Sequence, residues 1–149
     1  MPRRGINAPT DERIRQALAA DGQVLGVLSG SFPGLMAVYV FGSQVQGTAN
    51  PDSDLDLAIL VEGYADAERL WGISSTLANA VGCEVDLVDL RHASTVLQYQ
   101  VLTKGIRLWA KEPAVSLFEA YVCSEKLSLD EARAALVADV VQGGSVYGR

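Results

Sequence analysis

Histidine and cysteine are scarce in this 149-residue chain, which contains one histidine and two cysteines. Cys83 and Cys123 lie far apart and match no spacing typical of a metal site. Both stand in apolar segments, where we expect buried free thiols. His92 follows a predicted strand, and no nucleophile is paired with it. The sequence therefore gives no support to Ser-His-Asp chemistry, and we expect His92 in a loop or at the start of a helix.

Clusters of basic residues and long apolar runs are also lacking. The net charge is −6, and the basic residues are scattered apart from Arg3 and Arg4, so no basic stripe is available to follow a nucleic-acid backbone. No apolar run approaches the roughly 20 residues needed to span a bilayer. The first residues also lack the apolar core of a signal peptide. We therefore expect a cytoplasmic protein whose main partner is neither nucleic acid nor membrane.

The chain is 49% apolar, which is enough to build one domain with a real core. We expect this core over residues 11–112, a C-terminal helix over 113–141 and a mobile, glycine-rich tail over 142–149. Within the core, apolar periodicity predicts helices over 11–29, over 65–81 and from Ser94 toward Lys104, and strands over 35–41, 57–61 and 83–90. Strands that alternate with helices predict a small mixed sheet with helices mainly on one face, an α/β (α+β) fold.

The most informative pattern joins the first two predicted strands. Gly42 and Ser43 directly follow the first strand, ten residues separate Ser43 from Asp54, and Asp54-Leu55-Asp56 opens the second strand. Side chains two positions apart in a strand share one face, so Asp54 and Asp56 point the same way. Paired carboxylates are best tolerated beside a cation, and hard oxygen ligands suit Mg²⁺. Asp54 and Asp56 are therefore candidate ligands of magnesium, which could bind as a pair of ions.

Gly42 and Ser43 supply the second half of this pattern. They stand where a strand should break into a helix, and there a small residue, a hydroxyl and unpaired N–H groups can hold a phosphate. A lone Asp-x-Asp is usually a solvated start of a strand. The combination of strand, Gly-Ser, turn signals and Asp-x-Asp instead favours a site for a nucleoside triphosphate with magnesium.

A third carboxylate is expected on the next strand. Asp86 lies in the middle of that strand, where a charge is costly unless it is paired or bound to metal. Asp89 lies near the strand's end, where a surface pairing with Arg91 explains it. We therefore assign Asp86, rather than Asp89, as a metal ligand or general base.

These motifs resemble a known family. Gly42-Ser43, ten residues and Asp54-Leu55-Asp56 resemble the signature of the polymerase-β-like nucleotidyltransferases, above all their minimal nucleotidyltransferase (MNT) branch. The stretch 84–90 resembles the family's third strand, which carries the third carboxylate, and 101–109 resembles its closing helix end, glycine and short strand. The resemblance covers roughly residues 35 to 110. It implies the polymerase-β-like nucleotidyltransferase fold and a single nucleotidyltransferase domain.

The resemblance also implies a function. MNT proteins of this size are commonly the antitoxin of a two-gene toxin–antitoxin system, and they move AMP from ATP onto a tyrosine hydroxyl of a HEPN ribonuclease toxin. Gly42 and Ser43 would hold the triphosphate, while Asp54, Asp56 and Asp86 would bind Mg²⁺. The short chain agrees, because little of it is left after Pro113 to form a domain for a second substrate.

One departure from the family pattern and two alternatives stay open. Many members carry an arginine shortly after Gly-Ser, where this chain has Gln44, Val45 and Gln46. Either an arginine of the partner, Lys104 or Arg107 would then supply the cation, or the affinity for ATP would be weak or the enzyme slow. The alternatives are a non-catalytic antitoxin that only covers the toxin, and a small-molecule nucleotidyltransferase of the aminoglycoside type, which the missing acceptor domain disfavours.

Overall fold

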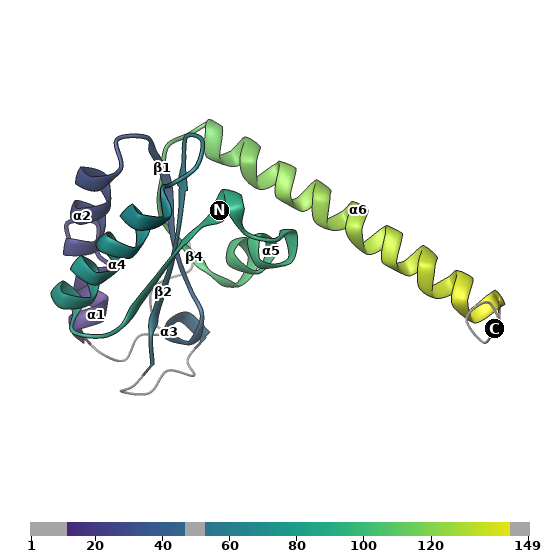
Figure 1. Cartoon of the computed structure of the whole chain (residues 1–149), viewed down its shortest axis with the longest axis horizontal. Helices are drawn as coiled ribbons and strands as arrows, with labels where there is room; N and C mark the ends of the chain where they lie inside the picture. Colours follow the sequence, from purple (N-terminus) through teal and green to yellow (C-terminus); the bar gives the residue numbers. More distant parts are fainter. Residues whose placement is uncertain (1–11, 47–52, 144–149) are drawn as a thin grey trace.

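The computed structural model describes residues 12–46 and 53–143, which form a four-stranded mixed sheet with helices on both faces (Figure 1). The strands stand in the order β3-β2-β1-β4 and are β1 (Leu35–Phe41), β2 (Leu55–Val61), β3 (Val85–Asp89) and β4 (Ile106–Ala110). The helices are α1 (Glu12–Ala17), α2 (Gln23–Ser31), α3 (Ser43–Gln46), α4 (Ala67–Val81), the short 3-10 helix η1 (Leu90–His92), α5 (Thr95–Lys104) and α6 (Ala114–Gly143). No helix among these described residues is long and apolar enough to cross a membrane.

The sheet combines antiparallel and parallel pairing, as the sequence predicted. The central strand β1 runs antiparallel to β2 and to β4, and β2 runs parallel to β3. Two parallel strands need a long crossover, which α4 supplies here. Strands β1 and β2 are apolar at almost every position because both of their faces are covered.

Helices cover the two faces unequally. Helices α1, α2 and α4 cover the larger core, while α5, η1 and the start of α6 cover the other face (Figure 1). The three helices over the larger core form the main layer of helices that the sequence predicted on one face. The second layer exists because Ala37, Tyr39, Ala58 and Leu60 point to the opposite face and are buried there.

Most of the predicted elements are confirmed. The strand over 35–41 has the expected bounds, and Ser94 caps α5 by accepting a hydrogen bond from the backbone N–H of Leu97. The helix expected over 113–141 is α6. The prediction of one continuous helix over 11–29 is wrong, because this segment is divided into α1 and α2, and α2 begins after Gly22. A Cβ at Gly22 would overlap the carbonyl oxygen of Ala17, so the chain turns tightly only because this residue is glycine.

Two further expectations concern residues outside the main core. Cys83 is half-buried, but Cys123 is exposed on α6, so the expectation of a buried thiol is wrong for Cys123. An apolar neighbourhood in sequence does not bury a residue that lies on the outer side of a helix. The expected tail begins inside α6, which extends to Gly143, and residues 144–149 lie outside the described part of the chain.

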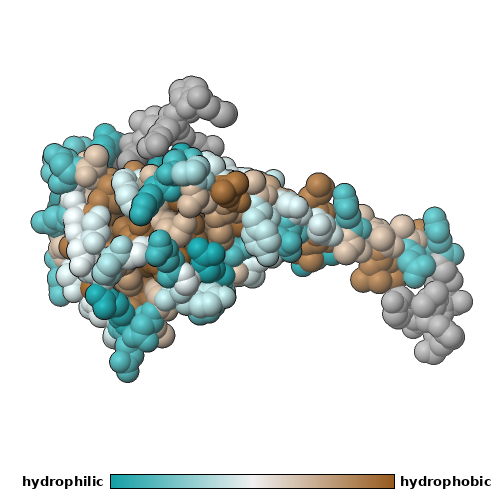
Figure 2. Space-filling model, turned by 90° about the horizontal axis from the view of Figure 1, so that it is seen from above, coloured by the Kyte–Doolittle hydropathy of each residue, from teal (hydrophilic) through white to brown (hydrophobic). Residues whose placement is uncertain are grey.

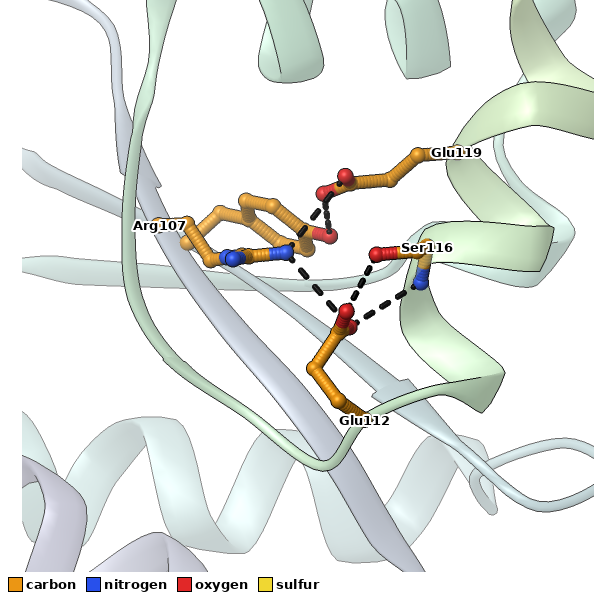
Figure 3. Close-up of polar contacts among 5 residues, drawn as sticks. Arg107, Glu112, Ser116 and Glu119 are labelled. Atoms are coloured by element: carbon orange, nitrogen blue, oxygen red, sulfur yellow. Dashed lines mark hydrogen bonds and ion pairs between the residues drawn. The ribbon is translucent and has the colours of Figure 1, made fainter. Parts of the chain in front are cut away.

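A cluster of hydrogen bonds and ion pairs links α6 to the sheet (Figure 3). The hydroxyl of Tyr39 in β1 donates a hydrogen bond of 2.6 Å to Glu119 in α6. Arg107 in β4 lies beside Tyr39 and places its Nη1 3.5 Å from Glu119 and 3.6 Å from Glu112. Glu112 also accepts hydrogen bonds from the backbone N–H and the hydroxyl of Ser116. Burial and the Glu119 carboxylate raise the pKa of Tyr39, so the phenol remains a donor at every working pH.

Replacing the buried phenol tests this cluster. We expect Tyr39→Phe to lower the free energy of unfolding by about 1–2 kcal/mol, because the Glu119 carboxylate loses its shortest hydrogen bond. Urea unfolding followed by circular dichroism measures the change. Tyr121→Phe removes a hydroxyl from an exposed residue of the same helix and should leave stability unchanged. Equal stability of the two variants would contradict the structural role of Tyr39.

Candidate active site

Three aspartates that the sequence singled out meet at one end of the sheet. Asp56 in β2 and Asp86 in β3 are register partners on parallel strands, which lie about 4.8 Å apart. Asp54 stands just before β2. Partial burial, followed by the carboxylates of Asp86 and Asp54 in that order, raises the pKa of Asp56 to about 6. Because the carboxylates of Asp54 and Asp86 both influence this pKa, both lie near Asp56.

The three carboxylates differ in exposure. Asp54 and Asp86 are exposed, whereas Asp56 is half-buried. Asp86 was expected to be costly in mid-strand, but β3 is an edge strand and its carboxylate reaches solvent. What distinguishes Asp86 is therefore the like charge beside it rather than its burial. Because the carboxylate of Asp86 is exposed, a ligand can reach it.

Gly42 lies directly against Asp56. Its φ is +80°, and a Cβ at this position would overlap Oδ2 of Asp56. The carbonyl of Gly42 accepts hydrogen bonds from the backbone N–H groups of Val45 at 3.1 Å and Gln46 at 3.2 Å, which closes the turn into α3. Ser43 is the first residue of α3. The structure thus brings the Gly-Ser turn and the carboxylates to the same end of β1 and β2.

Gln44 has a role that the sequence did not indicate. Its side chain is buried, and its Nε2 donates a 3.5 Å hydrogen bond to the carbonyl of Ser53, the residue before Asp54. Gln44 therefore links α3 to the start of β2 instead of contacting solvent. No sequence signal marks it, because a polar residue after Gly-Ser is ordinarily expected to be exposed. Residues 47–52 of the connecting loop lie outside the described part of the chain.

The two cations considered as substitutes for the missing arginine lie in different surroundings. Arg107 is engaged with Glu112 and Glu119 in the cluster that holds α6. Lys104 is exposed at the end of α5. The next residue, Gly105, packs against Phe41, so Lys104 lies near the Gly42 end of β1. A role of either cation at this site stays a prediction.

Asp89 is buried, so its expected surface pairing with Arg91 is wrong. Its carboxylate accepts hydrogen bonds from the backbone N–H groups of Ala65 at 2.9 Å and Arg91 at 3.1 Å. The side chain of Arg91 instead donates to the carbonyl of Val61. His92 was expected in a loop or at the start of a helix, and it is the last residue of the short 3-10 helix η1. Its ring stacks on Tyr64 with ring centroids 3.9 Å apart. These groups hold the loops at the far end of β2 and β3.

The described residues contain no ready-made metal cage. Within residues 12–46 and 53–143, no three His, Cys, Asp or Glu side chains are arranged so that they could hold a metal ion as they stand. The aspartates of β2 and β3 nevertheless supply the oxygen ligands that Mg²⁺ prefers. Their mutual repulsion is the feature that a bound cation would relieve.

Comparison with known proteins shows the family of this chain. The family model for the polymerase beta nucleotidyltransferase domain matches residues 28–114. Protein adenylyltransferase MntA of Shewanella oneidensis is 38% identical over 121 residues, which cover 81% of this chain and 87% of that protein.

Solved structures agree in both fold and sequence. A chain of a toxin–antitoxin structure with AMP-PNP superposes with a TM-score of 0.71 at 39% identity, covering 80% of this chain and 96% of that one. The tri-AMPylated Shewanella oneidensis HEPN toxin in complex with its MNT antitoxin gives a TM-score of 0.66 at 35% identity, covering 80% and 93%. The chain therefore belongs to the polymerase-β-like nucleotidyltransferases, in their minimal nucleotidyltransferase branch.

Proposed function

We propose that this chain is a magnesium-dependent protein adenylyltransferase that acts as an antitoxin in the cytoplasm. It transfers AMP from ATP to a tyrosine hydroxyl of a cognate HEPN ribonuclease toxin and so neutralises the toxin. The observation that carries the proposal is the pairing of Asp56 with Asp86 across β2 and β3, beside the Gly42 turn. The related MntA is a protein adenylyltransferase, and related structures contain AMP-PNP or a tri-AMPylated HEPN toxin.

The aspartates fit a magnesium site. Asp56 is half-buried near two other carboxylates, and its burial and their like charges raise its pKa. A bound cation would relieve this repulsion. Asp54 and Asp56 would hold the ion, with Asp86 as a further ligand. Magnesium held by these aspartates would neutralise phosphate charge and polarise the phosphoryl oxygens.

The protein's own groups position the reactants. Backbone N–H groups at the start of α3 and the hydroxyl of Ser43 would bind the β- or γ-phosphate, and the absent Cβ of Gly42 lets the Asp56 carboxylate lie against this turn. The tyrosine oxygen then attacks the α-phosphorus in line, a new P–O bond forms, and the bond to pyrophosphate breaks. Asp86 accepts the proton of the hydroxyl if it is not used as a ligand. Most of the rate enhancement comes from positioning and charge stabilisation.

Removing one carboxylate tests the chemistry. We expect Asp56→Asn to reduce transfer of label from α-labelled ATP to the purified toxin roughly 100-fold or more, because a charge that stabilises the reacting phosphate is lost. Asp66→Asn is the matched control, since Asp66 caps α4 and asparagine caps equally well. If Asp56→Asn still neutralises the toxin without transferring label, a non-catalytic antitoxin is correct instead.

Substitution of two glycines with positive φ distinguishes the effect of backbone strain from the effect of a contact with Asp56. Gly42 and Gly63 have φ of +80° and +72°, but only a Cβ at Gly42 would meet Asp56. We expect Gly63→Ala to lower stability by about 1–2 kcal/mol while AMP transfer continues. Gly42→Ala should cost more and should also reduce AMP transfer roughly 100-fold, because Asp56 is displaced. Equal activity of the two variants, measured at saturating ATP, would rule out this contact as a catalytic constraint.

The raised pKa of Asp56 predicts a pH dependence of stability in the metal-free protein. The pKa is about 6 in the fold against 3.8 for the free side chain, so the contribution of Asp56 to stability is greatest below pH 4 and is lost as pH rises through 6. Asp56→Asn should remove this loss and stabilise the metal-free chain at pH 7 by on the order of 1 kcal/mol. Unfolding in urea at pH 4 and pH 7, with EDTA or with Mg²⁺, measures it. Magnesium should stabilise the wild type only, and identical pH profiles for both proteins would contradict the prediction.

A further inference from the structure

The second half of α6 extends beyond the rest of the domain (Figures 1 and 2). The first half is anchored, because Val115 and Val122 are buried against the sheet face that α5 also covers. Lys126 still lies over the ring of Tyr99 in α5, with its Nζ 5.0 Å from the ring centroid. From Asp130 onward, α6 is exposed at every described position. At about 1.5 Å per residue, residues 130–142 reach roughly 20 Å into solvent.

The apolar stripe of α6 continues into this exposed half. Val115, Val122 and Leu129 recur at intervals of seven, and Leu136 and Val140 prolong the same side of the helix at the spacing of successive turns. Leu136 is nevertheless 56% exposed and Val140 39% exposed. The stripe that packs against the domain in the first half of α6 therefore has no cover from the described residues in the second half.

Two further side chains widen this surface. Val137 and Val141 are exposed beside the stripe, and together with Arg133, Ala134 and Ala138 they line a shallow groove. Figure 2 shows brown, hydrophobic side chains along the projecting helix. We call Leu136, Val137, Val140 and Val141 the distal apolar face. An exposed apolar face of this kind favours burial against a partner.

From this surface we infer that the distal apolar face is the docking site for the HEPN toxin, an inference that rests on the proposed function. A ribonuclease needs cationic surface for its polyanionic substrate. Asp130 forms an ion pair with Lys126, with Nζ 2.7 Å from the carboxylate, so Glu131 and Asp139 against Arg133 leave a local charge of −1. An acidic helix with an apolar stripe complements a basic partner with an apolar groove. A second copy of this chain would bring the same negative segment, and the repulsion disfavours self-pairing.

The arrangement separates binding from chemistry. The carboxylates and the Gly42 turn lie on the sheet, whereas the distal apolar face lies on a helix that extends away from it (Figure 1). Loss of the face should therefore weaken capture of the toxin without changing the reacting groups. In kinetic terms, KM for the toxin rises while kcat at saturating toxin stays the same.

A double substitution on the helix tests the inference. Leu136→Asp/Val140→Asp places two charges on the distal apolar face, and Leu117→Asp/Leu127→Asp places the same two charges on exposed positions elsewhere on α6. Calorimetry should show toxin affinity about tenfold or more weaker for the first variant and near wild type for the second. AMP transfer at saturating toxin should keep its wild-type kcat in both. In the wild type, amide hydrogen exchange over residues 130–142 should slow on addition of toxin.

The outcomes separate this inference from the proposed function. Wild-type affinity of Leu136→Asp/Val140→Asp, or unchanged exchange over residues 130–142, would overturn the docking site and leave the adenylyltransferase intact. A wild-type dimer that this variant converts to a monomer, with toxin affinity unchanged, would assign the face to a second copy and also overturn it. Toxin that binds the wild type through this face but never receives AMP would refute the proposed function alone.

Discussion

Asp56 and Asp86 carry like charges and lie side by side on the parallel strands β2 and β3, with Asp54 close by. Such a pair is unfavourable in the free protein, and it persists because the remaining interactions of the sheet outweigh it. Both central strands are apolar and covered on both faces, so their register is fixed by burial. The register then places the two carboxylates together regardless of their repulsion. The hydrophobic core thereby keeps the two carboxylates together, where we propose that a cation binds.

Close packing around this pair adds a steric constraint to the electrostatic one. Gly42 has a positive φ and leaves no space for a side chain beside Asp56, while buried Gln44 links the turn to Ser53. The turn that should hold phosphate and the carboxylates that should hold metal are thus parts of one packed unit. A displacement of either part would move the other, which explains why a single methyl group at Gly42 is expected to impair the chemistry.

A second polar cluster serves a different purpose on the same sheet. Tyr39, Arg107 and Glu119 join β1, β4 and α6, and they fix the direction in which α6 leaves the domain (Figure 3). Arg107 is thereby occupied away from the phosphate turn. The domain is consequently divided between a sheet that holds the reacting groups and a helix that extends an acidic, partly apolar surface. This division suits an enzyme whose acceptor is another protein.

The sequence by itself determined the strands, most helices and the candidate residues Gly42, Ser43, Asp54, Asp56 and Asp86, because these depend on local periodicity and spacing. The tertiary structure alone decided properties that depend on neighbours distant in sequence. It buried Asp89 and Gln44, exposed Cys123, divided the first helix at Gly22 and set Asp86 beside Asp56. The burial of a side chain and its distance from other charges depend on contacts with several elements that are distant in sequence. The local sequence pattern does not specify those contacts.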